Sequence, residues 1–349
     1  MPVRLYPAEK LRAFAEQALA RCKVPESDAA VVADNLVEAN LRGVDSHGVT
    51  SLLGIYVKRL KKGLINPRPS FSVVSESPST LVLDADNGLG ALIGKRAMQE
   101  CLRRASESGA AWAGVRHSNH FGAAAYFSLM AARSGRIGIA MTNGPPNMPP
   151  WGGSRPYLST NPISIALPAE GEPVVLDMAT SVVARFQIIR AATRGDTALP
   201  EGWALDERGR PTTDPKEALE GFAMPMGGHK GYGLSLMIDA LCGVLAGGAF
   251  GPDVGSLQRR FDRPQDVGHM FAAIDVARMI PLPEFSSRLA RMCSELHQIE
   301  PAQGFERVYV PGEIEAEQRR RRLKEGIPVD ETAWQRLREV AQELKISLE

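Results

Sequence analysis

A short polar stretch, Asp45-Ser46-His47-Gly48, carries the side chain that is best suited to proton transfer near neutral pH. It lies between two apolar runs with helical spacing, residues 29–41 and 52–60, so we expect His47 to stand in a loop between two helices. From such a loop a histidine can reach a cleft and act there as a general acid or base. The same residue types also cap helices, so the stretch taken alone is more typical of an ordinary interhelical loop.

Two further histidines, His117 and His120, stand in a polar segment between a predicted strand at 111–115 and a predicted helix at 123–133. In such an arrangement ligands bind at strand ends and anions bind at helix N-termini. Histidines three residues apart could also bind a metal ion, and with His47 they would suit a metal-dependent hydrolase. No carboxylate or thiolate stands nearby to complete a usual site, so we predict no metal.

Two later segments also carry residues that suit a nucleotide. Asp177 follows a predicted strand at 174–176, where an acidic side chain often holds a ribose, although a capping or solvated Asp is the simpler interpretation. His229 and Lys230 lie in a glycine-rich stretch before a predicted helix at 234–246, where backbone N–H groups and a positive charge can approach a ligand. The spacing is not that of a Walker loop, and no GxGxxG sequence follows any predicted strand, so a standard Rossmann domain is not expected.

The elements that would position these residues indicate an α/β fold with helical ends. We divide the chain into a helical part at 1–70 that carries the SHG sequence, an α/β core at 71–287, and a helical part at 288–349 that packs with the first. The polar segment 191–221, rich in Gly and Pro, is predicted as a long surface loop and a candidate lid. Strands are predicted at 71–74, 80–83, 111–115, 136–142, 163–167, 174–176, 269–276 and 304–310.

Composition argues against several classes of function. The 349 residues suffice for one large or two ordinary domains, and a net charge of +1 does not favour nucleic acid or a membrane surface as a partner. The basic run Arg319–Arg322 is therefore interpreted as a solvated helix face. Four cysteines that are far apart, with no CxxC pair, argue against a disulfide framework or a structural zinc site. No run of about 18 apolar residues and no apolar signal core occur, so we expect a protein of the cytoplasm.

Taken together and in order, several segments resemble the malate/L-lactate dehydrogenase family of the type that lacks the Rossmann fingerprint. That family also holds ureidoglycolate, sulfolactate, 2,3-diketogulonate and Δ1-piperideine-2-carboxylate oxidoreductases. The likeness runs nearly end to end, and eight segments in the right order make a specific signal although no single one is decisive. The segments are LRGVDSHGV at 41–49, HSNHFGAA at 117–124, PPWGG at 149–153, STNPIS at 159–164, LDMATSVVA at 176–184, PMGGHKGYGL at 225–234, GHMFAAID at 268–275 and VPGE at 310–313.

The resemblance implies an enzyme that transfers a hydride between NAD or NADP and a small 2-keto or 2-hydroxy acid. It leaves two alternatives open: a reductase of cyclic imino acids such as Δ1-piperideine-2-carboxylate, and a nucleotide-binding relative with little or no activity. The fold of the family is its own, an NAD(P)-binding α/β domain of the non-Rossmann type with helical N-terminal and C-terminal parts. Its members are typically homodimers in which the partner completes the cleft, so a small acid and a second copy of the chain are the expected partners.

The same resemblance assigns roles to residues of this chain. His47 would give a proton to the carbonyl oxygen or the imine nitrogen, with Ser46 beside it as a relay partner. Thr160 matches a substrate contact. The residues that match the parts holding the dinucleotide are His120, Phe121, Gly122, Ala123, Ala124, Asp177, Met178, Ala179, Thr180, His229, Lys230, Pro311, Gly312 and Glu313.

Two positions depart from the pattern of the family. Most relatives carry an Arg four residues after the SHG histidine, where its planar fork would pair with the substrate carboxylate, and here that residue is Ser51. Relatives usually continue the DMATSVVA segment into a Gly-Lys pair, whereas here Arg185 is followed by Phe186-Gln187. We therefore expect either that Arg185 or another arginine binds the carboxylate or that the substrate lacks the usual carboxylate geometry, and we expect Phe186 to narrow the cofactor or substrate pocket.

Overall fold

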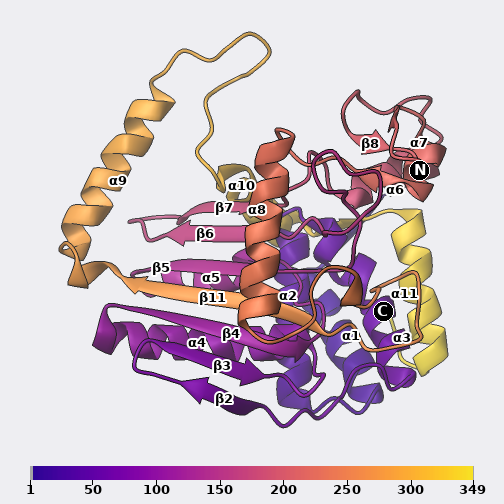
Figure 1. The fold of residues 1–349 in the computed structure, drawn as a ribbon, viewed down its shortest axis with the longest axis horizontal. Helices are drawn as coiled ribbons and strands as arrows, with labels where there is room; N and C mark the ends of the chain where they lie inside the picture. Colours follow the sequence, from indigo (N-terminus) through magenta and orange to yellow (C-terminus); the bar gives the residue numbers. More distant parts are fainter. Residues whose placement is uncertain (1–2, 349) are drawn as a thin grey trace.

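A mixed sheet of seven strands forms the centre of the fold in the computed structural model, which describes residues 3–348 (Figure 1). In spatial order the strands are β2 (Ser72–Glu76), β3 (Thr80–Asp84), β4 (Ala110–Ser118), β11 (Val267–Asp275), β5 (Arg136–Thr142), β6 (Ile163–Leu167) and β7 (Val174–Met178). Neighbours are antiparallel except for β3 and β4, which are parallel because α4 (Gly90–Ser108) connects them as a crossover. The α/β fold predicted from the sequence is confirmed.

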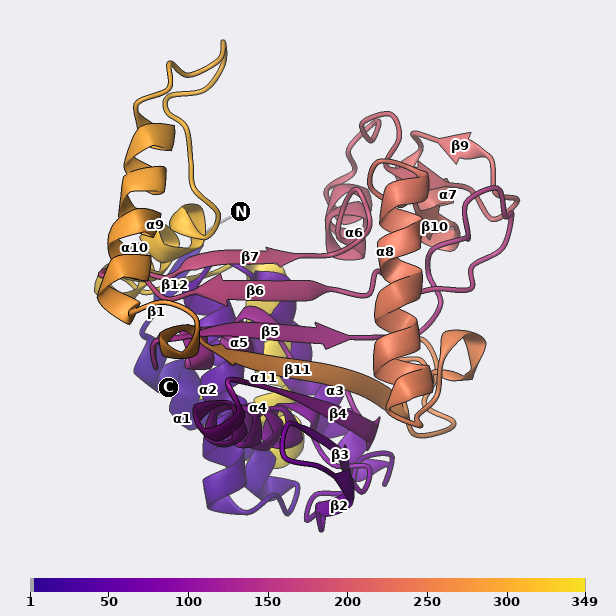
Figure 2. The ribbon, with the colours of Figure 1, turned by 60° about the vertical axis from the view of Figure 1, so that its left-hand side comes forward.

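Helices cover both faces of this sheet, because alternate residues of the central strand β11 point to opposite sides. On one face, Phe271 packs in a core with α4 and α5 (Ala125–Ala132). On the other face, Met270 packs against α8 (His229–Asp239) and its π-helical continuation (Ala240–Leu245). Figure 2 shows α8 crossing the sheet near one end of its strands. The cavity described below is lined by residues at strand ends, among them Thr142, Met178 and Val267.

A second hydrophobic core joins the two ends of the chain. Its helices are α1 (Ala8–Arg21), α2 (Glu26–Leu41), α3 (Val49–Lys61) and α11 (Glu331–Leu344). Beside them β1 (Arg4–Tyr6) pairs antiparallel with β12 (Ile327–Val329), so segments more than 300 residues apart are hydrogen-bonded to each other. The division of the chain into three parts stays a prediction, because these contacts do not fix where one part ends.

The chain between the sheet and α11 forms two helices with a long connection. In Figures 1 and 2, α9 (Leu282–His297) stands away from the body beside one end of the strands. The strand predicted at 304–310 is wrong: the structure describes all of these residues and none of them belongs to a strand. An apolar run becomes a strand only where a sheet edge is available to pair with it, and the sequence pattern does not show that edge.

The other helix, α10 (Glu313–Glu325), packs against α2. The prediction that its basic run forms a solvated face is wrong for two of the four arginines. Arg319 pairs with Glu38 of α2 at 2.9 Å, and Arg322 pairs with Asp45 at 2.7 Å. These contacts tie α10 to the loop that carries His47.

Residues 185–223 form a small folded unit, so the prediction of an irregular surface loop at 191–221 is wrong. Its core contains Ile188, Ala191, Leu199, Ala204 and Ala218. Strands of two residues carry no periodic pattern, which is why the sequence did not reveal them. The elements are α6 (Arg185–Arg194), β8 (Ala204–Leu205), β9 (Pro211–Thr212), α7 (Pro215–Glu220) and β10 (Phe222–Ala223).

Two element boundaries also differ from the predictions. Strand β4 runs on to Ser118, so His117 belongs to the strand and not to the loop after it. Helix α8 begins at His229, so His229 and Lys230 lie in its first turn and not in the glycine-rich loop before it. In both elements, the backbone hydrogen bonds extend beyond the residues that carry the apolar pattern. Element boundaries are therefore hard to predict from the sequence.

Candidate active site

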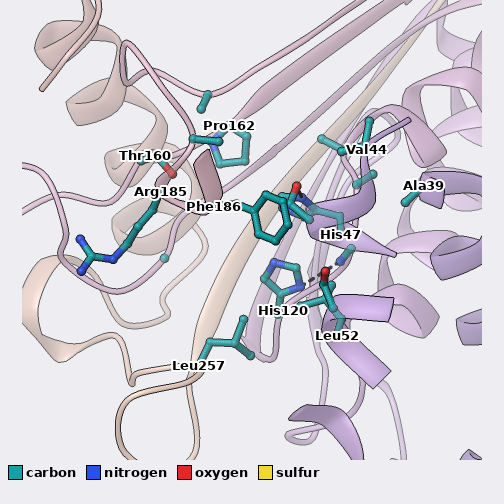
Figure 3. A pocket seen from close by; sticks show the side chains of 18 of the residues that line it. Ala39, Val44, His47, Leu52, His120, Thr160, Pro162, Arg185, Phe186 and Leu257 are labelled. Atoms are coloured by element: carbon teal, nitrogen blue, oxygen red, sulfur yellow. Dashed lines mark hydrogen bonds between the residues drawn. The ribbon is translucent and has the colours of Figure 1, made fainter. Parts of the chain in front are cut away.

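A large cavity, of about 1950 Å³, lies where the helices α2 and α3, the strand ends, and the 185–223 unit meet. The predicted residues that line it are Ser46, His47, Ser51, His120, Gly122, Ala123, Ala124, Thr160, Asp177, Met178, Ala179, Arg185, Pro311 and Gly312. Figure 3 shows His47, His120 and Phe186 pointing into one part of this cavity. The fold therefore brings together side chains that are more than 250 residues apart in the chain.

His47 is held in place by a rigid loop between α2 and α3. It ends a short 3-10 turn (Asp45–His47), and Asn40 accepts a hydrogen bond from the Val49 N–H at 2.8 Å just beyond that turn. A Cβ at Gly48 would lie 2.2 Å from Asn40, so this close approach requires glycine. The Asp45 carboxylate is already bound by Asn40 and Arg322, which means that it fixes the loop and does not act as a relay on His47.

The His47 ring is poised in its neutral form. Its Nδ1 lies 2.8 Å from the Ser46 Oγ, and its ring stacks on His120 with centroids 5.4 Å apart. Burial lowers the pKa of His47 to about 4, because the charged imidazolium loses its hydration there. At neutral pH the ring can therefore accept a proton, and Ser46 can donate to Nδ1 or accept from it as the tautomer requires.

His120 is held as a hydrogen-bond donor. Its Nδ1 accepts from the Gly122 N–H at 3.2 Å and lies 2.9 Å from the Tyr56 hydroxyl, so the ring proton is on Nε2. Burial, together with the neighbouring His47 and His269, lowers the pKa of His120 well below its usual value. A neutral ring with Nε2–H in the cavity wall can donate to a substrate oxygen but does not supply a charge.

A second part of the cavity has the donors that a dinucleotide phosphate needs. Within residues 3–348, the backbone N–H groups of Ala123 and Ala124, just before α5, meet no acceptor. Two guanidinium groups, those of Arg42 and Arg133, line the cavity with them. Free amides at a helix N-terminus and nearby cations bind anionic oxygens, so the residues present fit a nicotinamide dinucleotide.

Asp177 lies at the same end of the cavity, at the end of β7. Its carboxylate accepts a hydrogen bond from the Ala125 N–H at 3.1 Å. Burial raises the pKa of Asp177 to about 6, while the Ala125 bond and the charge of Arg42 act in the opposite direction. Gly312, with φ +92°, brings its backbone close to Val175 on the same strand, where a Cβ would lie 3.0 Å from the Val175 side chain.

The predicted substrate residues line the cavity from three elements. Ser51 faces it from the first turn of α3, and Thr160 has its carbonyl fixed by the Thr180 hydroxyl at 3.0 Å. Arg185 donates from Nη1 to the Gly221 carbonyl at 3.1 Å. Burial, and the charge of Arg259, lower the pKa of Arg185 to about 10. In Figure 3 the Arg185 guanidinium extends away from His47 and His120.

Five of the predicted cofactor residues do not line the cavity. Phe121 is buried and stacks on His269 at 4.6 Å, so it supports the cavity wall from behind. His229 and Lys230 are exposed at the start of α8. Glu313 accepts a hydrogen bond from the Val310 N–H at 3.0 Å. The remaining residue, Thr180, is buried and makes the bond to Thr160.

The structure does not bring together the three histidines that the alternative of a metal-dependent hydrolase would require. The Nδ1 of His117 lies 2.8 Å from Asp84, and His117 lines a different, small cavity. His47 and His120 stack in the large one. In the described part of the chain, no group of three His, Cys, Asp or Glu side chains could hold a metal ion.

Five arginines in the cavity wall were missed from the sequence: Arg42, Arg133, Arg259, Arg260 and Arg336. Arg42 lies inside the LRGVDSHGV segment, so its place next to the histidine motif was a usable signal. Arg133 and Arg259 stand in segments with no recognisable motif, and only the tertiary fold brings them to the cavity.

Known proteins share this architecture over nearly the whole chain. The family model for malate/L-lactate dehydrogenase matches residues 6–338. Malate dehydrogenase of Pyrococcus horikoshii is 40% identical over 350 residues, covering 97% of this chain and 95% of that protein. L-sulfolactate dehydrogenase of Methanocaldococcus jannaschii is 41% identical over 329 residues, covering 93% of each chain.

A solved structure gives the same result in three dimensions. Sulfolactate dehydrogenase from Methanocaldococcus jannaschii superposes with a TM-score of 0.92 at 38% identity, covering 99% of this chain and 98% of that one. The protein is therefore an enzyme of the dehydrogenase class whose fold is not that of a Rossmann domain. The chain belongs to the malate/L-lactate dehydrogenase family, which confirms the resemblance found from eight sequence segments. No helix within residues 3–348 has the length and apolar character needed to span a bilayer.

Proposed function

We propose that the enzyme transfers a hydride between NAD or NADP and a small 2-keto or 2-hydroxy acid, with His47 as the proton donor and acceptor. The observation that carries this proposal is the placement of His47 in the large cavity, with Ser46 Oγ 2.8 Å from its Nδ1. The relatives support it, because malate and sulfolactate are both 2-hydroxy acids.

The dinucleotide would be held by the part of the cavity where anion donors gather. Ala123, Ala124 and Arg42, which line this part, would bind its phosphates, while Asp177 and Gly312 would hold the adenosine side. When bound, the nicotinamide ring supplies or takes up the hydride. Met178, Ala179 and Pro311 form the adjacent wall, and Thr180 keeps Thr160 in position.

Proton transfer follows from the state of the His47 ring. In the oxidation of a hydroxy acid, neutral His47 takes the hydroxyl proton, and its low pKa keeps the ring neutral and ready at pH 7. In the reverse direction the ring must first be protonated, and the negative charge of a bound acid favours that protonation. Ser46 holds the ring through Nδ1, and the Nε2–H of His120 donates to the substrate oxygen as negative charge develops there.

The absorbance of the reduced nicotinamide tests this proposal directly. NADH and NADPH should each be offered with pyruvate, oxaloacetate, longer 2-keto acids and cyclic imino acids. Turnover of a keto acid is the expected result. Turnover of cyclic imines alone would indicate a C=N reductase, and binding of both cofactors without turnover of any compound would indicate a relative with little or no activity.

We also propose a homodimer in which the partner completes the cleft. Exposed apolar side chains on α8 and its π-helical continuation support it, since Met237, Val244 and Leu245 are each more than half exposed in the single chain, at 56%, 59% and 65%. Light scattering after size-exclusion chromatography should give twice the mass of the chain. A monomer that keeps full activity would contradict this part of the proposal.

A further inference from the structure

Two guanidinium groups converge on one carbonyl at the wall of the cavity. Arg185 begins α6, and Arg259 lies in the segment between residues 255 and 266. The Nη2 of Arg259 donates to the Leu219 carbonyl at 2.9 Å, and the Nη2 of Arg185 donates to the same oxygen. Both side chains line the cavity, so two like charges are held next to each other where a ligand can reach them.

The charge of this pair is not neutralised by an ion pair within the protein. Within residues 3–348, neither Arg185 nor Arg259 has a carboxylate oxygen within 4.0 Å, and Glu220 acts on Arg185 only from a greater distance. Their contacts are instead the carbonyls of Leu219 and Gly221 at the end of α7. Carbonyl dipoles orient guanidinium groups but do not cancel their charge, so the pair retains the capacity to bind an anion.

The segment that carries Arg259 is anchored at both ends. The fully buried Arg59 of α3 donates to the Ser256 carbonyl at 2.9 Å and to the Arg263 carbonyl at 3.0 Å. The Phe261 ring lies under the Lys58 ammonium at 4.1 Å. These contacts place Arg259 before any ligand binds, which lowers the entropic cost of holding an anion there.

We propose that Arg185 and Arg259 bind an acid group of the substrate that lies remote from the reacting carbon. The substrate is then a 2-keto or 2-hydroxy acid with a second anionic group at its far end. The direction of Arg185 in Figure 3, away from His47 and His120, assigns the pair to that far end. This inference rests on the proposed function, because His47 defines where the reacting carbon lies.

Calorimetry with dicarboxylate and monocarboxylate probes tests the anion site without turnover. Succinate and butyrate, which have the same chain length, should be titrated into the full-length enzyme with NADH present. The wild-type enzyme should bind succinate at least about tenfold more tightly than butyrate, as expected for one charge-assisted contact. Arg259→Gln should remove this preference. The matched control is Arg260→Gln, because Arg260 lines the same cavity and makes no hydrogen bond to α7 in the described part of the chain.

Kinetics with oxaloacetate and 2-oxobutyrate complete the test. Arg259→Gln should raise the KM for oxaloacetate about tenfold with little change in kcat, and should leave 2-oxobutyrate unaffected. Equal losses in Arg259→Gln and Arg260→Gln, or no preference for succinate in the wild-type enzyme, would overturn the inference. A succinate preference that depends on Arg259 in an enzyme that reduces no keto acid would support the anion site and refute the proposed reaction instead.

Discussion

Two walls of one cavity hold their polar groups in opposite electrical states. Around His47 and His120, burial keeps the titratable rings neutral, and their contacts are hydroxyl and amide groups. Around Arg185 and Arg259, the groups keep a permanent charge and are oriented by carbonyl oxygens. A group that must exchange protons is useful when its charge can change, whereas a group that recognises an acid is useful when its charge cannot.

The two walls also differ in how closely they follow the pattern of the family. The histidine wall keeps the SHG and HSNHFG sequences. The wall that contains Arg185 departs from this pattern at Phe186 on α6, while the other departure, Ser51, stands on α3 close to His47, and both residues line the cavity. Chemistry of one type can thus be retained while the acid that enters the site changes, because the reacting groups and the recognition groups come from different elements.

The largest effect is expected at the histidine wall. His47→Ala should lower kcat about a hundredfold or more in both directions, because no other group replaces the proton carrier. Fluorescence titration should show that NADH still binds with nearly wild-type affinity. The matched control is His229→Ala, which removes an exposed histidine that does not line the cavity. A wild-type rate in His47→Ala would contradict the proposed role.

Removing an arginine that binds the cofactor should change the cofactor affinity, whereas removing one that binds the acid should change the KM for the acid. Arg42→Gln should weaken the binding of NADH or NADPH about tenfold or more, since it removes a buried guanidinium that lines the cavity with the amides proposed to bind phosphate. The KM for the acid should hardly change. Fluorescence titration measures the first quantity and initial rates measure the second, with Arg320→Gln on the exposed side of α10 as the control. An increase in the KM for the acid alone would place Arg42 at the wrong end of the cavity.

Replacing Ser51 by the arginine that most relatives carry tests how the substrate carboxylate is bound. Ser51→Arg is expected to raise kcat/KM for lactate-like or malate-like acids, by up to about tenfold, because a guanidinium then faces the reacting end of the substrate. Ser51→Lys is a matched variant with a charge but no planar fork, and it should give a smaller gain. No change, or a loss, in both variants would show that the carboxylate is held elsewhere.

The sequence predicted much of the fold because its signals are local. Apolar periodicity placed most helices and core strands within a few residues of their observed ends, and the DSHG stretch indicated a loop between two helices. Such local signals include the cap of the last helix, α11, where the Asp330 side chain accepts from the Ala333 N–H at 2.8 Å. The short strands β8, β9 and β10 were missed because their pairing with one another, and not a local pattern, makes them strands.

Residues of the candidate site could be predicted from the sequence only where a motif contains residues that line the cavity. The motif segments led to His47, His120 and Asp177, all of which line the cavity. The environment of these groups is made by contacts between residues that are far apart in the chain, such as Arg322 and Asp45, which are 277 positions apart. A sequence gives no sign of such contacts, and the Arg259 side chain is another case, since a tertiary contact with Leu219 is what places it.

The smallest expected effect is on stability, and it distinguishes a neutral buried histidine from the charged arginines. His269, behind Phe121, is fully buried between Thr142 and Ser118 and has a pKa lowered to about 3 by burial. The unfolded chain binds the proton near pH 6.5, so the free energy of unfolding should fall as the pH drops from about 6.5 towards about 3, by about 1 kcal/mol per pH unit. Urea unfolding at a series of pH values measures this slope.

His269→Gln should be less stable at pH 7 but should show a shallower slope, whereas Arg259→Gln should run parallel to the wild-type curve because an arginine does not titrate in this range. Equal slopes in the wild-type and His269→Gln proteins would mean that the histidine is protonated in the folded state, and the contrast between the two walls would then rest on His47 and His120 alone.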